Sequence, residues 1–157
     1  MTQERRPLWV VNRHPRLAAS RGGVQRALRI LDRHAGRFRG GCPPGELSVA
    51  LLTDGALAGL HARFLGEPGA TDVITFGGDA AAAAAGEICV SADAALRQGG
   101  GRRALSRELT LYIVHGWLHL AGYDDTTACA RRAMRRAERR AMGILRAESA
   151  VPRFKLA

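Results

Sequence analysis

The residues best suited to chemistry lie in one short segment in the last third of the chain. His115 and His119 are four residues apart, so a helix would place them on one face, one turn from each other. Two imidazoles placed in this way can bind one divalent metal ion. Gly122 follows three residues later, where a left-handed residue would end the helix and reverse the chain. Asp124 or Asp125 could then supply a third ligand.

Three protein ligands leave one coordination position open for water or substrate, which is the arrangement of a catalytic rather than a structural zinc site. The alternative is that both histidines are packed core residues. Two histidines at this spacing, followed by a glycine and acidic residues, favour the metal site. The other three histidines have no such partners, and we expect packing or surface roles for His14, His34 and His61.

The charge of the chain indicates a polyanionic partner. The sequence has 24 basic and 14 acidic residues, for a net charge of +10, and Lys155 is its only lysine. Guanidinium groups match phosphate geometry and stack on bases, so this excess favours RNA or DNA. The segment 130–148 carries seven arginines and two glutamates, and part of it could face RNA. The alternative is a biased composition in which most arginines are merely solvated.

Size and composition exclude several other classes of protein. A chain of 157 residues with 46% hydrophobic residues predicts a single folded domain over 1–157. No apolar run approaches the roughly 20 residues of a membrane helix, and the first apolar stretch is too short for a signal peptide. Cys42, Cys89 and Cys129 are odd in number and widely spaced, which predicts neither a disulfide framework nor a zinc ribbon. We therefore expect a cytoplasmic protein without a membrane partner.

The hydrophobic pattern predicts the elements that must position the histidine segment. We expect strands at 8–12, 46–53, 71–76 and 86–91, and helices at 23–35, 54–65, 92–97, 105–121 and 126–147. Strands interleaved with helices, followed by two helices in succession, predict an α/β (α+β) fold. Its core would be one mixed four-stranded sheet packed with helices.

Two local features are predicted in more detail. Asp54 is expected to cap the helix that follows it, with Leu57, Leu60 and Phe64 directed inward. Residues 77–86 are rich in alanine and glycine and lack any apolar period, so we expect a flexible hairpin loop there.

The segment from His115 to Asp125 is similar to H-G-x-L-H-L-x-G-Y-D-H, the signature of the YbeY family of bacterial metal-dependent endoribonucleases that mature ribosomal RNA. The resemblance extends over 46–125, in order. T-D-V-I-T-F at 71–76 resembles the family's T-D-V-L-S-F, Gly86-Glu87-Ile88 resembles its G-D-I strand, and Glu108 precedes the first histidine by seven residues.

The resemblance implies a mixed α/β sandwich with one Zn2+ ion at the end of the long penultimate helix, near a basic cleft. It implies His115, His119 and Asp125 as the ligands. The substrate would be a single-stranded region of an rRNA precursor, and the partners would be the small ribosomal subunit and its assembly factors. The roles implied are rRNA maturation and ribosome quality control.

The sequence departs from the family pattern at two positions. Asp125 replaces the third histidine, and a carboxylate is a competent zinc ligand that lowers the charge of the centre and should acidify its water less. Leu65 stands where the family has an arginine thought to engage phosphate. Arg63 is the candidate replacement if the helix end rotates or frays; otherwise it is a solvated side chain.

Weaker candidates remain beside this site. Residues 99–101 are glycines followed by Arg102 and Arg103, which could bind an RNA backbone through N–H and guanidinium groups, or could form a plain loop. Asp72 could bond to a ligand histidine from outside the metal shell or could cap a strand. No residue stands out as the general base.

Two other functions are open at this point. The histidine spacing also resembles the zinc protease pattern H-E-x-x-H-x-x-G-x-x-[HD], but Gly116 occupies the position of the glutamate base. The second is a non-catalytic, ribosome-associated RNA-binding protein that retains a zinc site, which Asp125 and Leu65 favour. The intact histidine pair and Gly122 favour the enzyme.

Overall fold

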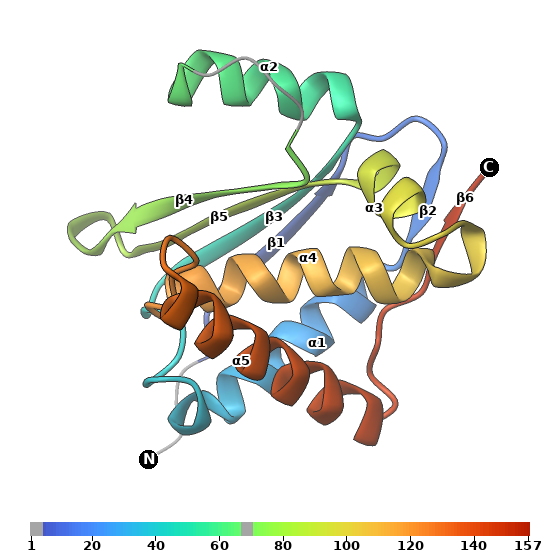
Figure 1. The fold of residues 1–157 in the computed structure, drawn as a ribbon. Coiled ribbons are helices and arrows are strands. Elements are labelled where there is room, and N and C mark those ends of the chain that lie inside the picture. Colours follow the sequence, from blue (N-terminus) through green and yellow to red (C-terminus); the bar gives the residue numbers. More distant parts are fainter. Residues whose placement is uncertain (1–4, 67–70) are drawn as a thin grey trace.

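The structure, a computed structural model, describes residues 5–66 and 71–157. Its centre is a four-stranded sheet in the order β1–β3–β5–β4 (Figure 1). The first three strands in this order are parallel, and β4 runs antiparallel to β5. The bounds are β1 Leu8–Asn12, β3 Glu46–Leu52, β4 Val73–Asp79 and β5 Ala84–Ser91. This confirms the predicted mixed α/β architecture.

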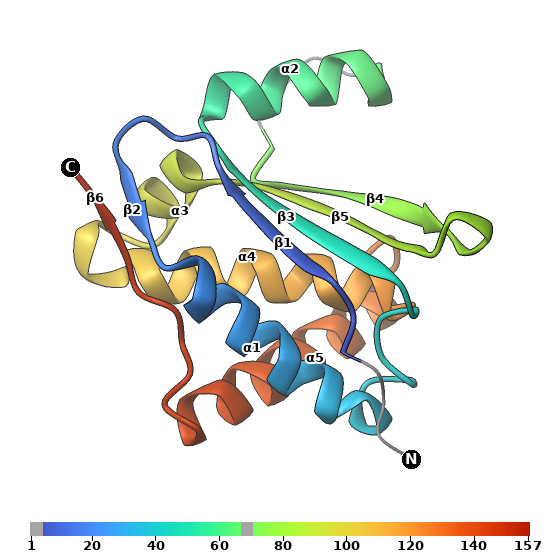
Figure 2. The same cartoon turned by 180° about the vertical axis from the view of Figure 1, so that it is seen from behind.

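Helices cover the two faces of the sheet unequally. The helices α1 and α4 pack on one face, and α5 packs on these two helices; α2 lies over part of the other face, and α3 follows β5 (Figures 1 and 2). Their bounds are α1 Arg21–Arg33, α2 Asp54–Leu65, α3 Ala92–Gln98, α4 Leu105–Leu120 and α5 Ala128–Ala147. In the part of the chain that the structure describes, no helix combines the length and apolar character needed to cross a membrane.

The main core lies between the sheet and α4. Leu47, Val49 and Ile88 project from the strands and are buried in one cluster with residues of α1 and α4. Trp117 of α4 is fully buried, with its ring 5.4 Å from that of Phe38 and edge-on to it. Alternate strand residues thus face the helix layer, as the period of two requires. This packing holds α4 in a fixed position against the sheet.

Gly116 allows α4 to approach the sheet closely. A Cβ atom built at this position would lie 2.5 Å from Cγ2 of Ile88, which is too close for any side chain. The last turns of α4 therefore lie directly against β5 and β4, and the residues on either side of Gly116 are brought to the edge of the sheet.

The start and the inner face of α2 differ from the prediction. Thr53, rather than Asp54, caps the helix: its side chain accepts a hydrogen bond from Ala56 N. Leu57 is buried as expected, but Phe64 is 59% exposed and contacts only the ring of Phe76 among the aromatic residues described. The prediction that Phe64 is directed inward was wrong: its ring contacts Phe76 of β4, but most of its surface stays in solvent.

The alanine-rich segment is more regular than predicted. β4 continues to Asp79, a short 3-10 turn spans Ala80–Ala82, and β5 begins at Ala84. Ala83 adopts a left-handed conformation with φ of 53°, and Asp79 accepts a hydrogen bond from Ala81 N. The hairpin was predicted correctly, but its flexible loop is largely paired strand, because backbone bonds do not need an apolar side-chain pattern.

A second, two-stranded sheet was not predicted. It pairs β2, Leu17–Ala19, with β6, Phe154–Leu156, in antiparallel fashion. Figure 1 shows it at the end of α4 away from the start of α5. Strands of three residues are too short to show a hydrophobic period, so the sequence gives no signal for them.

Candidate metal centre

The end of α4 brings the candidate ligands together. The helix ends at Leu120, and Gly122 adopts a left-handed conformation with φ of 99°, as predicted. Its amide donates to the carbonyl of His119, and the Tyr123 amide donates to the carbonyl of Leu118. These bonds turn the chain back on the helix end, and Asp125 returns to the two histidines.

Three ligand atoms converge on one point. Nε2 of His115 lies 3.0 Å from Nε2 of His119, and Oδ2 of Asp125 lies 3.5 and 3.7 Å from these two nitrogens. A tetrahedral zinc ion with ligands at about 2.0–2.1 Å separates them by about 3.3 Å from one another. The spacing of the three groups and their chemistry therefore fit a single metal ion.

Asp124 takes a different role from Asp125. Its carboxylate accepts hydrogen bonds from the Asp125 amide, at 2.7 Å, and from the Thr126 hydroxyl, at 2.7 Å. The Thr126 hydrogen bond, followed by the bond from the Asp125 amide, lowers the pKa of the Asp124 carboxyl. Of the two aspartates, the structure therefore directs Asp125 to the histidines and uses Asp124 to shape the turn.

Glu138 of α5 contacts the far side of the first histidine. Its Oε1 lies 2.7 Å from Nδ1 of His115, which leaves Nε2 of that ring directed to the other two ligand atoms. Burial opposes the charged form of His115, but the hydrogen bond and charge of Glu138 outweigh it and raise the pKa of His115. A carboxylate at Nδ1 fixes the tautomer and the orientation of a metal-binding imidazole. Sequence reasoning missed Glu138; the only signal was that it is the single acid within α5.

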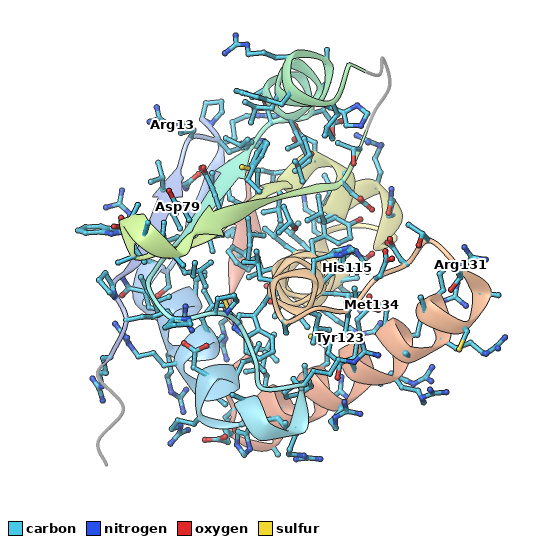
Figure 3. The ribbon with its side chains drawn as sticks, turned by 90° about the vertical axis from the view of Figure 1, so that its left-hand side faces the viewer. Arg13, Asp79, His115, Tyr123, Arg131 and Met134 are labelled. Carbon is cyan, nitrogen blue, oxygen red and sulfur yellow. The ribbon has the colours of Figure 1, made fainter. Side chains whose placement is uncertain are left out.

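The ligand atoms line a cavity of about 420 Å³ between α4 and β4. Figure 3 views α4 nearly end-on, with His115 on its flank between β4 and the first turns of α5. Beside the three candidate ligands and Leu120, the cavity is lined by Thr71, Asp72, Val73, Thr75 and Gly77. The candidate ligand atoms therefore share one cavity with the start of β4.

Two polar side chains that line the cavity, those of Asp72 and Thr75, lie just before β4 and within it. Asp72 brings a second carboxylate to the cavity. Oγ1 of Thr75 is buried and has no hydrogen-bond partner among the described residues. A buried hydroxyl without a partner is costly, and Thr75 is a lining residue of the cavity, so a ligand bound there is a candidate for the missing bond.

Arginines hold the loop that carries Asp125. The Arg39 guanidinium lies over the ring of Tyr123, 4.1 Å from its centre, and donates to the carbonyl of Gly122. Arg140 of α5 donates to the Tyr123 hydroxyl and to the carbonyl of Arg37. These contacts fix the loop between α4 and α5, and sequence analysis did not anticipate them.

The predicted phosphate contacts lie apart from this cavity. Arg63 and Leu65 are exposed on α2, across the sheet from α4, and neither lines the cavity in the described part of the chain. Arg102 and Arg103 are exposed in a 3-10 turn just before α4, at the opposite end of this helix from the histidines. The structure brings the three metal candidates together and leaves these three arginines elsewhere.

Comparison with known proteins gives the relationship. The family model described as Endoribonuclease YbeY matches residues 18–146. A protein of Chlamydia pneumoniae named Endoribonuclease YbeY is 31% identical over 96% of this chain and 98% of its own length. One of Frankia alni with the same name is 38% identical over 59% of each chain. The solution structure of TM1509 from Thermotoga maritima shares the fold, with a TM-score of 0.55 and 19% identity over 91% of this chain and 94% of its own. The chain belongs to the YbeY endoribonuclease family.

Proposed function

We propose that this chain is a zinc-dependent endoribonuclease that cleaves single-stranded RNA, with His115, His119 and Asp125 as ligands of one zinc ion. The observation that carries the proposal is the convergence of these three side chains in an open cavity, in a chain whose relatives are named endoribonucleases. The cavity gives a phosphodiester access to the point where the three ligand atoms meet.

Zinc, when bound, supplies Lewis acidity and lowers the pKa of water, so that a nucleophile forms near neutral pH. The chain itself orients the reactants. Glu138 holds His115 in one ring orientation through Nδ1. Asp72, which lines the cavity, would accept the proton of the attacking water, and the hydroxyl of Thr75 would donate to a phosphoryl oxygen. Asp125 would lower the charge of the centre compared with a third histidine, so zinc held there would acidify its water less.

We propose rRNA maturation as the process, with an rRNA precursor as substrate. The small ribosomal subunit and its assembly factors would be the partners, and ribosome quality control a further role. The support is the YbeY relationship together with the net charge of +10, which suits an RNA-rich particle. We also propose that residues 1–157 act as one domain in the cytoplasm.

A non-catalytic RNA-binding protein is the second candidate. Leu65 at the position of the family's arginine is the observation that favours it. Metalloprotease activity is disfavoured by packing, because a glutamate at position 116 would place its Cβ against Ile88. A protease of this pattern would therefore lack its base and the space for one.

Cleavage of labelled RNA by the purified protein tests the proposal. We expect zinc-loaded protein to cut a single-stranded oligonucleotide internally, and a chelator to abolish the cutting until zinc is restored. His119→Ala, purified in parallel, controls for a contaminating nuclease and should be inactive. RNA binding without cleavage by the zinc-loaded protein would instead identify the non-catalytic alternative.

A further inference from the structure

We propose that the exposed face of α5 is an RNA-binding surface that leads to the metal centre. The α5 arginine face is formed by Arg131, Arg132, Arg135, Arg136 and Arg139. Its ligand would be the phosphate backbone of single-stranded RNA. The inference rests on the proposed function only in taking RNA as the ligand, and it concerns binding rather than cleavage.

The packing of α5 leaves these arginines in solvent. The helix buries Met134, Ala137, Ala141, Met142 and Leu145 against the rest of the protein. All five members of the α5 arginine face are exposed. Figure 3 shows Met134 on the side of α5 that faces α4 and Arg131 directed away from it. The apolar side of α5 is therefore buried in the core, and its arginine-bearing side is open to solvent.

The positive charge of this face is not compensated within the fold. Arg131, Arg135 and Arg139 follow one another at four-residue spacing, and like charges at this spacing destabilise a helix. The one acid within α5, Glu138, is directed to His115 instead. A helix that accumulates repulsion on its exposed side is stabilised when a polyanion binds there.

Among the described residues, three arginines outside α5 form ion pairs. Arg6 pairs with Asp32, Arg33 with Glu148, and Arg97 with Asp54. By contrast, four members of the α5 arginine face make no ion pair and no side-chain hydrogen bond with any described residue. These are Arg132, Arg135, Arg136 and Arg139. Their guanidinium groups are free to bind phosphates.

The α5 arginine face is continuous with the metal centre. Arg131 donates to the carbonyl of Asp125, the third candidate ligand. Glu138, which reaches His115, lies between Arg135 and Arg139 along the helix, so these two arginines are on the same turns of α5 as a residue that contacts a candidate ligand. A helix of 20 residues is about 30 Å long. An RNA strand bound along α5 would pass the cavity near the first turns of this helix.

The chemistry of this face favours RNA over a membrane or a protein. Its apolar residues are buried against the core, so the helix has no free apolar side to insert into a bilayer. The exposed side carries arginines among small residues and offers no large apolar anchor for a protein interface. Guanidinium groups bind phosphate in bidentate fashion, and RNA presents a continuous row of phosphates.

Two variants with the same loss of charge test the proposal. The first changes four members of the face to glutamine: Arg132→Gln, Arg135→Gln, Arg136→Gln and Arg139→Gln. It leaves Arg131 and Arg140, which contact the loop between α4 and α5, in place. The matched control changes four exposed arginines around β2, β6 and the first turns of α1 and α4: Arg16→Gln, Arg21→Gln, Arg107→Gln and Arg153→Gln.

Binding of a fluorescent single-stranded RNA of mixed sequence is measured by anisotropy over a series of salt concentrations, without zinc so that no cleavage occurs. The α5 variant should bind at least about tenfold more weakly, and its slope of log K against log salt should fall by roughly 3, at about 0.7 per phosphate contact. The control should keep the parent's slope to within about 1. Equal weakening in both variants, or none in the α5 variant, would overturn the proposal.

Stability and cleavage measurements separate this inference from other failures. The α5 variant should melt at or above the parent's temperature at low salt, because repulsion along the helix is removed. If it does not fold, the pairs Arg132→Gln with Arg136→Gln and Arg135→Gln with Arg139→Gln should each give about half the change in slope. If the parent cleaves no RNA but the two variants differ in slope as expected, the endoribonuclease proposal is rejected and the binding-surface proposal is retained. A parent that cleaves RNA while the slopes do not differ rejects the surface alone.

Discussion

The carboxylate of Glu138, on α5, lies 2.7 Å from Nδ1 of His115, on α4. This contact joins the arginine-rich helix to the candidate metal centre and leaves Nε2 of the ring for the metal. Its partner residues are 23 positions apart in the sequence, so it depends on the packing of α4 against α5.

Glu138→Ala should weaken zinc binding by about 10- to 100-fold, because His115 loses the group that fixes its ring. Competition with a coloured chelator measures this affinity directly. Glu148→Ala, at the C-cap of the same helix, is the control and should bind zinc like the parent. Equal zinc affinity in Glu138→Ala and the parent would show that the contact does not position the ligand.

Thr75 is expected to serve a ligand rather than the fold. Thr75→Val removes a buried hydroxyl that has no described partner, so the metal-free variant should be as stable as the parent or more stable by about 1 kcal/mol. RNA cleavage should slow while zinc affinity is unchanged, and Thr75→Ser should keep most of the rate. A loss of stability in Thr75→Val would mean that the hydroxyl is bonded within the protein.

The two positions at which the chain departs from the family pattern are expected to affect its rate of RNA cleavage. Asp125→His should keep zinc bound and add positive charge to the centre, so the pH profile of kcat/KM should move to lower pH. Leu65→Arg should restore the family's guanidinium at the end of α2, and Leu65 is 55% exposed, so the change is tolerated. If one bound RNA reaches both positions, the effects of the two changes should couple.

We expect the double variant to cleave RNA about tenfold faster than the parent, which corresponds to about 1.4 kcal/mol of barrier. Single-turnover cleavage rates of the zinc-loaded proteins measure this gain, and the two single variants are the controls. A folded, zinc-loaded double variant that cleaves no faster would show that these two positions do not limit the rate.

A cluster of polar side chains around Asp54, at the start of α2, should make the stability of the fold sensitive to acid. The hydrogen bond from Arg97, assisted by one from Ser91, lowers the pKa of the Asp54 carboxyl below its usual value of 3.8. Burial opposes ionisation of Asp93, but its hydrogen bond with His14 outweighs this and lowers its pKa as well. Carboxyls with a lowered pKa in the folded state stabilise the fold above their unfolded pKa, and this contribution is lost as pH falls through the folded value.

The free energy of unfolding of the metal-free protein should therefore decrease as pH falls below about 4. Urea titrations across this range give the slope. Asp54→Asn should flatten the slope, and Arg97→Gln, which removes the partner and leaves the carboxyl, should flatten it similarly. A parent with constant stability over this range would contradict the assignment.

The parts of the fold and site that are local in sequence could be predicted. His115, His119 and Gly122 lie within one helix end, so their spacing alone indicates both the shared face and the reversal of the chain. The strands of the central sheet were also recognised, because buried parallel strands are rich in β-branched and aliphatic residues.

The parts that depend on contacts between residues far apart in the sequence could not be predicted. Leu17 pairs with Leu156 across almost the whole chain, and two three-residue strands leave no pattern. The orphaned hydroxyl of Thr75 becomes apparent only when Gly116 brings α4 against β4, where a Cβ at 116 would lie 3.2 Å from Oγ1 of Thr75. The loop contacts of Arg39 and Arg140 likewise require the packed helices.

The zinc content of purified variants tests the central claim most directly. We expect one zinc ion per chain in the parent, measured by elemental analysis after exhaustive desalting. His115→Ala, His119→Ala and Asp125→Ala should each lose it, since each removes one of three ligands that converge at 3.0–3.7 Å. His34→Ala, which lies near Glu148 and away from the cavity, should retain it. Full zinc content in any of the three ligand variants, or no zinc in the parent, would contradict the account.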